Sequence, residues 1–102
     1  MQQTLLRWIG IFEVYPNDEN MLNGAVGAFV NVIGLAESCT SFVSLAKHKL
    51  SNMEFEVINV NDVELVSDRL QRNDLVDELL DLVNNLCDEN PILFDEFHAY
   101  VE

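Results

Sequence analysis

Basic residues are scarce in this chain, and their scarcity excludes several classes of partner. Only five of the 102 residues are lysine or arginine, against 18 aspartates and glutamates, so the net charge at pH 7 is −13. Nucleic-acid phosphates and anionic lipids repel such a protein over a Debye length of about 8 Å at physiological salt. We therefore expect no binding to nucleic acid and none to a membrane.

Cysteine and long apolar segments are also scarce. The two cysteines, Cys39 and Cys87, each fall on the apolar side of an expected helix, which predicts buried, reduced thiols and neither a disulfide nor a metal site. Residues 1–15 lack the features of a secretory signal, and the apolar run 25–36 is too short to span a bilayer. These absences predict a cytoplasmic protein without a membrane segment.

What the chain has in abundance is apolar surface. Hydrophobic residues make up 49% of the sequence, which is too much for a disordered chain despite the charge. A chain of this length buries enough surface for one core but not for two. We expect residues 1–102 to form a single α/β domain.

Hydrophobic periodicity divides the chain into strands at 4–15, 25–35, 54–66 and 91–102 and helices at 37–53 and 73–90. The first two strands should form a hairpin, because their connection is too short for a crossover helix. Ser38 and Asn73 are the expected N-caps, and Asn61-Asp62 breaks the third strand as a bulge or turn would. The prediction is an α+β two-layer sandwich of about four mainly antiparallel strands with two helices on one face, in the ferredoxin-like element order β-β-α-β-α-β.

The negative charge is concentrated in the second half of the chain. Residues 1–53 carry a net charge of −1 and residues 54–102 a net charge of −12. Charge that serves only solubility has no reason to collect in one half, whereas a docking face for a basic partner does. The asymmetry favours a basic protein as partner.

Five of the fourteen acidic residues in this half recur with helical period between 74 and 88. The acidic residues of this stripe, which we predict to contact a partner, are Asp74, Asp77, Glu78, Asp81 and Asp88. Like charges four positions apart cost a few tenths of a kcal/mol each, and no basic residue of the helix relieves them. A solvated acidic face is the commoner explanation of such a stripe, but the repulsion favours a function for it.

The last strand carries a second polar cluster. Glu96, His98 and Tyr100 alternate along it, and we predict that they too contact a partner, although a half-buried sheet face would look the same. No residues are spaced as a structural zinc site or a calcium loop, so we expect no metal or other cofactor. We also expect no catalytic residues, because a buried helical thiol is normally inert.

In size, acidity, cytoplasmic character and lack of a catalytic motif, the chain resembles small bacterial toxin-immunity proteins. The resemblance implies an immunity or inhibitor protein that occupies a basic surface, such as that of a nuclease toxin. The alternative is a self-associating structural or regulatory subunit, since the first strand is apolar on both sides and two helices cover only one face of a sheet. The expected homodimer contact is then the set Leu5, Ile9 and Ile11 or the facing pair Trp8 and Phe12. That the chain is an enzyme is the third and least favoured hypothesis.

Overall fold

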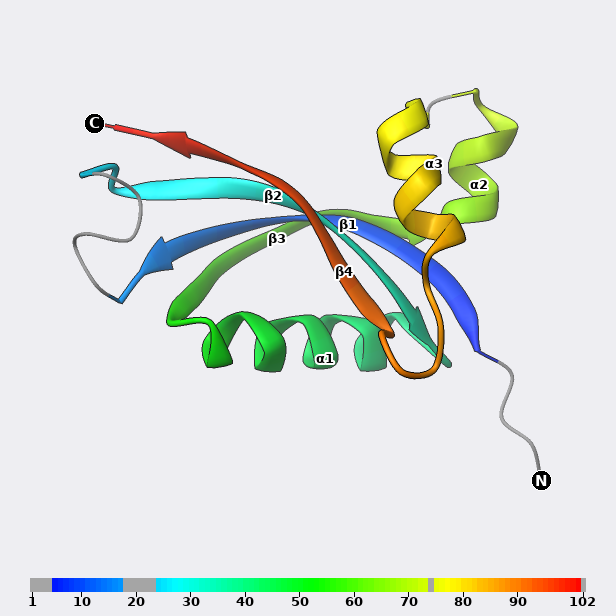
Figure 1. Cartoon of the computed structure of the whole chain (residues 1–102), viewed down its shortest axis with the longest axis horizontal. Helices are drawn as coiled ribbons and strands as arrows, with labels where there is room; N and C mark the ends of the chain where they lie inside the picture. The colour runs from blue at the N-terminus through cyan, green and yellow to red at the C-terminus, as the bar shows by residue number, and fades with distance from the viewer. Residues whose placement is uncertain (1–4, 18–23, 74, 102) are drawn as a thin grey trace.

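The computed structural model describes residues 5–17, 24–73 and 75–101. Its elements, drawn in Figure 1, are β1 (Leu6–Pro16), β2 (Gly27–Ala36), α1 (Cys39–Asn52), β3 (Phe55–Leu65), α2 (Val66–Gln71), α3 (Asp77–Asn84) and β4 (Ile92–Tyr100). The four strands form one sheet in the order β3-β1-β2-β4, and every neighbouring pair is antiparallel. The predicted α+β class, the antiparallel sheet and the β1–β2 hairpin are confirmed.

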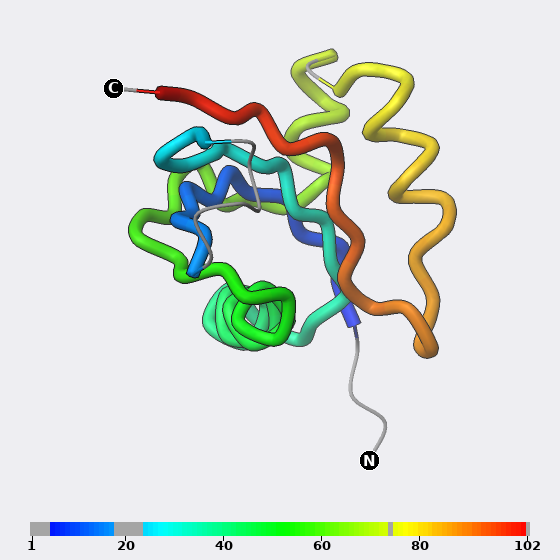
Figure 2. The backbone as a smooth tube through the Cα atoms, turned by 60° about the vertical axis from the view of Figure 1, so that its left-hand side comes forward, coloured from blue at the N-terminus to red at the C-terminus, as the bar shows by residue number. Residues whose placement is uncertain are grey.

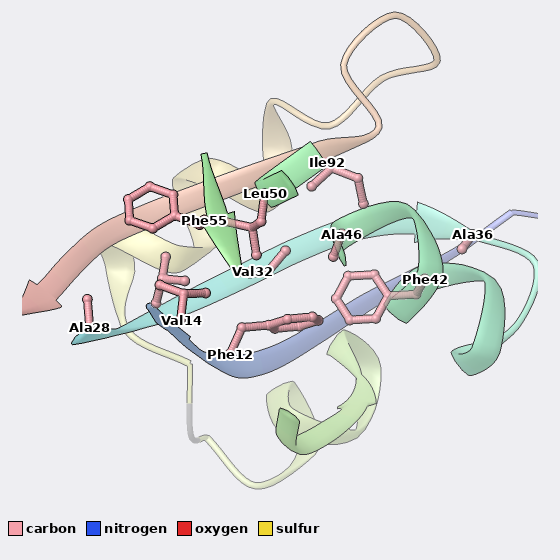
Figure 3. Close-up of a cluster of buried hydrophobic side chains, with 11 residues drawn as sticks. Phe12, Val14, Ala28, Val32, Ala36, Phe42, Ala46, Leu50, Phe55 and Ile92 are labelled. Carbon is pink, nitrogen blue, oxygen red and sulfur yellow. The ribbon is translucent and has the colours of Figure 1, made fainter. Parts of the chain in front are cut away.

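One face of the sheet is covered by α1. Side chains of the helix and of all four strands form the main core, shown in Figure 3, whose fully buried aromatic members are Phe12 and Phe42. The predicted cap is present, because the backbone N–H of Ser41 donates to the Ser38 hydroxyl at 3.1 Å. Lys49 near the helix end donates to the carbonyl of Ile92 at 3.1 Å, which joins α1 to the start of β4.

The other face is covered by α2 and α3, at one end only. Ile9 and Ile33, a cross-strand pair in the register of β1 and β2, pack there with Val66, Leu79 and Val83 in a second cluster. Figures 1 and 2 show α1 on one side of the sheet and the α2–α3 pair on the other. The prediction that both helices lie on one face is therefore wrong, because successive strand residues point to opposite faces and β1 is apolar on both.

The segment 73–90, predicted as one helix, contains the shorter helix α3 followed by a turn. Asn73 has a left-handed backbone (φ 54°) and its N–H donates to the carbonyl of Leu70, so it ends α2 and does not cap α3. The helix α3 ends at Asn84, and the chain then makes a turn closed by the bridge between Cys87 and Asn90. Asp74 lies outside the described residues.

The cysteine prediction is partly wrong. Both Cys39 and Cys87 are free thiols, but both are exposed. Cys39 is the first residue of α1, where the helix begins outside the core, and Cys87 follows the end of α3. In the sequence, each cysteine lies in line with an apolar helical stripe. In the structure, it lies beyond the part of the helix that packs on the sheet, so its thiol is exposed.

Candidate partner-binding face

The acidic residues of α3 point away from the core. Asp77, Glu78 and Asp81 are exposed, while Leu79 and Val83 of the same helix are buried against the sheet. Asp88 is also exposed, in the turn that follows the helix. Among the residues that the structure describes, no salt bridge involves these four carboxylates. Asp77 and Glu78 lie in the first turn, where the helix dipole stabilises them, whereas Asp81 lies beyond it.

An open hollow lies on the part of the sheet that α2 and α3 leave uncovered. Its volume is about 530 Å³, and its lining residues come from all four strands: Ile11, Phe29, Val30, Asn31, Asn61, Asp62 and His98. Ile11 alternates with Ile9 along β1, and Asn31 alternates with Ile33 along β2, so this hollow lies on the same side of the sheet as α2 and α3.

Two β-bulges shape the sheet at the hollow. On β3, Asn61 pairs with Ile11 and Glu64 pairs with Ile9, which leaves Asp62 and Val63 opposite Gly10. Asp62 takes a left-handed backbone (φ 54°), and consecutive residues Asn61 and Asp62 therefore both line the hollow. The break that the sequence predicted at Asn61-Asp62 is confirmed as this bulge.

The second bulge lies across the sheet from the first. Val32 pairs with Phe94 and Val30 pairs with Phe97, so two residues of β4, Asp95 and Glu96, are opposite Asn31. The extra residue reverses the alternation of β4 and places both phenylalanines against the main core. Glu96 is exposed beside this bulge and does not line the hollow.

Tyr100 closes the other end of the uncovered face. Its hydroxyl donates to Glu13 Oε2 at 2.5 Å, and its ring lies 5.3 Å from the ring of Phe29. The ring occupies the space above Gly27, where an added Cβ would lie 2.5 Å from the Tyr100 hydroxyl. The hydrogen bond to Glu13, together with desolvation, raises the pKa of Tyr100 well above its ordinary value near 10.

This contact gives a testable pH dependence. Because the folded-state pKa of Tyr100 is raised, its contribution to stability is complete below about pH 10 and is lost as the pH rises through the folded value. We expect one of the two tyrosines to resist ionisation in the native protein when tyrosinate absorbance is followed to high pH. Glu13→Gln should remove this resistance, and Glu56→Gln should keep it. Identical titrations of wild type and Glu13→Gln would contradict the assignment.

A cluster of charges fixes α2 against β3. Glu64 Oε1 accepts hydrogen bonds from Arg72 Nη2 at 2.6 Å and from Arg69 Nε at 3.2 Å. The hydrogen bond from Arg72 is the main reason that the pKa of Glu64 lies below its usual range. These ion pairs join Arg69 and Arg72, the two arginines of the second half of the chain, to Glu64.

The lowered pKa sets the direction of a second pH effect. Glu64 contributes stability above its ordinary pKa of 4.5, and this contribution is lost as the pH falls through the lower folded value. The difference in unfolding free energy between wild type and Glu64→Gln should be largest near neutral pH and shrink in acid. Urea unfolding at a series of pH values measures it. A difference that stays constant or grows in acid would show that the ion pairs do not stabilise the fold.

Five of the predicted site residues that the structure describes, Asp77, Glu78, Asp81, His98 and Tyr100, lie on one side of the sheet in two groups. The α3 acids lie over one end, and His98 and Tyr100 lie on the uncovered strands beyond it. Of the residues that line the hollow between them, the sequence predicted His98 as a partner contact and Ile11 only as a dimer contact, and it did not predict Phe29 or Asn31 as site residues. The only signal for the hollow was the interruption at Asn61-Asp62.

Within the described part of the chain, no group of three or more histidine, cysteine, aspartate or glutamate side chains is placed to hold a metal ion. No helix among the described residues is long and apolar enough to cross a membrane. Comparison with models of protein families, with curated proteins and with solved structures found no match for this chain.

Proposed function

We propose that this chain is an acidic protein-binding module that neutralises a basic partner, as an immunity or inhibitor protein does for a nuclease toxin. In this proposal it acts in the cytoplasm and carries out no reaction of its own. The observation that carries the proposal is the placement of the exposed α3 carboxylates and the uncovered sheet hollow on one side of the sheet.

The two parts of this face have different physical roles in binding. The carboxylates of α3 attract a basic surface from a distance and raise the rate of encounter. The hollow supplies what the helix lacks, namely apolar and aromatic surface around Ile11 and Phe29 that loses water on contact. Affinity in protein interfaces usually comes from a few such desolvated contacts inside a polar rim.

The alternative, a self-associating subunit, has weaker support. Ile9 and Phe12, two of the predicted contact residues, are fully buried within the same chain, and the Trp8 indole N–H donates to the carbonyl of Ala36 at 3.0 Å. Leu5 remains exposed and Ile11 half-buried. What favours the alternative is Phe29, a large apolar side chain that is 41% exposed on the sheet.

The test is capture of the partner from an extract of the source cells, with wild type and two matched variants. One variant carries Asp77→Lys, Glu78→Lys and Asp81→Lys. The control carries Glu37→Lys, Glu54→Lys and Glu56→Lys, which change the net charge equally at exposed sites outside α3 and the hollow.

We expect wild type and the control to retain one basic protein whose activity they block, and the α3 variant to lose it. Retention should weaken as salt is raised. Capture of a neutral or acidic protein, or capture indifferent to both salt and the α3 substitutions, would reject the proposal. Sedimentation showing a stable dimer in the absence of any partner would favour the self-associating subunit.

A further inference from the structure

We infer that the hollow between Ile11 and Asp62 accepts an arginine side chain of the basic partner. The inference rests on the proposed function and assigns the group that its central pocket recognises.

The lining has the two kinds of surface that a guanidinium side chain requires. Ile11 and Phe29 present apolar and aromatic surface, against which the methylene stem and the planar head of arginine pack. Asp62 supplies a carboxylate, whose two oxygens match the paired N–H donors of a guanidinium. The amide oxygens of Asn31 and Asn61 are further acceptors on the same lining.

The cations of this chain lie elsewhere. Lys47 and Lys49 belong to α1, across the sheet from the hollow. Arg69 is bonded to Glu64, and Arg7 lines a separate hollow against α2 and α3. No lysine or arginine is among the residues that line the hollow of Asp62, and its one basic side chain is that of His98. A chain of net charge −13 thus presents a carboxylate beside apolar surface on an open sheet face, which is complementary to a cationic side chain with an apolar stem.

The bulge on β3 places the Asp62 side chain on the same face of the sheet as the hollow. Without the extra residue, strand alternation would put Asp62 on the opposite face of the sheet from Asn61, where α1 packs. The left-handed backbone at a non-glycine residue carries a conformational cost that the fold must offset. Its result is a carboxylate and an amide side by side at the hollow.

The experiment is an NMR titration of the full chain with N-acetyl-arginine amide, N-acetyl-lysine amide and N-acetyl-citrulline amide. Citrulline has nearly the shape of arginine without its charge, and lysine has the charge without the planar donors. We expect saturable shifts of Asn31, Asn61 and Asp62 with arginine, binding about fivefold weaker with lysine, and no saturation with citrulline.

A matched pair of variants locates the response. Asp62→Asn should weaken arginine binding about tenfold, since a hydrogen bond to a charged group is lost. Glu56→Gln removes one negative charge from the same strand outside the hollow and should change binding less than about twofold. Backbone shifts of each free variant that match wild type outside the substituted strand establish that the fold is retained.

The results separate this inference from the proposed function. Equal responses to the three probes, shifts confined to α3, or no saturable binding would overturn the arginine site, even if a basic partner is captured through α3. Self-association through Phe29 would also overturn it, because a second copy would then occupy the hollow. Arginine binding at Asp62 without any basic partner would support the site and reject the proposed function.

Discussion

Replacing Phe42 with alanine is expected to lower the free energy of unfolding by about 3–5 kcal/mol, the cost of removing a phenylalanine from a packed core. Phe42 is fully buried, and its ring meets that of Phe12 edge to face with centroids 6.0 Å apart. Total stabilities of domains this size are about 5–15 kcal/mol, so this one substitution removes a large part of the total.

The reason for so large an effect is that two strands are shaped around this ring. A Cβ added at Gly34 would lie 2.8 Å from Phe42 Cδ1, and one added at Gly10 would lie 3.6 Å from Phe42 Cε2. The glycines let α1 approach the sheet closely, and neither has a side chain that could fill the space left by the ring. The cavity should therefore persist, and a persistent cavity adds to the loss of buried surface.

Urea unfolding of purified variants measures this prediction, and the same helix provides the control. Leu45 is 43% exposed on α1, and Leu45→Ala should change the unfolding free energy by no more than about 0.5 kcal/mol. Gly34→Ala tests the packing from the strand side and should cost about 1–3 kcal/mol by overfilling the same space. Equal effects of Phe42→Ala and Leu45→Ala would show that α1 is not packed as described.

Much of this fold could be predicted from periodicity alone. The strands and α1 begin and end within about two residues of their predicted bounds. The hairpin followed from the short connection between two apolar strands, and Ser38 followed from the chemistry of helix capping. These features depend on local sequence, which is why local sequence revealed them.

The errors lie where a single extra residue or the third dimension decides the outcome. In β4, alternation predicts that Phe94 and Phe97 face opposite ways, but the bulge opposite Asn31 puts both against the main core. In β3, a register shift beside Ile58 likewise lets Val57 and Val60 face the same core while Ile58 is 40% exposed. When the position of a bulge is unknown, the face to which each residue beyond it points cannot be predicted from alternation.

The face of the sheet on which α2 and α3 pack could not be predicted, for a different reason. A stripe of leucines shows that a helix packs on something, but it does not say on which face of the sheet. The apolar pattern on both sides of β1 is the available signal, and it fits a dimer contact as well as a second layer of helices. A helical pair on the second face of the sheet buries Ile9 equally well, and it leaves the hollow as the uncovered remainder.

The acidic helix yields the prediction with the largest effect on function. Asp77→Lys, Glu78→Lys and Asp81→Lys together should slow association with the basic partner by roughly 10- to 1,000-fold at low salt, the range over which electrostatic steering acts. The wild-type rate should exceed the unsteered range of about 10⁵ to 10⁶ M⁻¹s⁻¹ and fall steeply as salt screens the field. Stopped-flow mixing at several ionic strengths measures both.

The fold sets the controls for this experiment. Asp77 and Glu78 lie in the first turn of an eight-residue helix, where lysines oppose the helix dipole at a cost of about 0.3–1 kcal/mol each. Asp81→Lys alone avoids that cost, removes the like-charge pair with Asp77 and should still slow association. The Glu37, Glu54 and Glu56 triple lysine variant matches the full charge change and should keep most of the wild-type rate. If the two triple variants slow association equally, net charge and not the α3 face steers the partner. If neither alters the rate at any salt, a partner held by apolar contacts with the sheet becomes the better account.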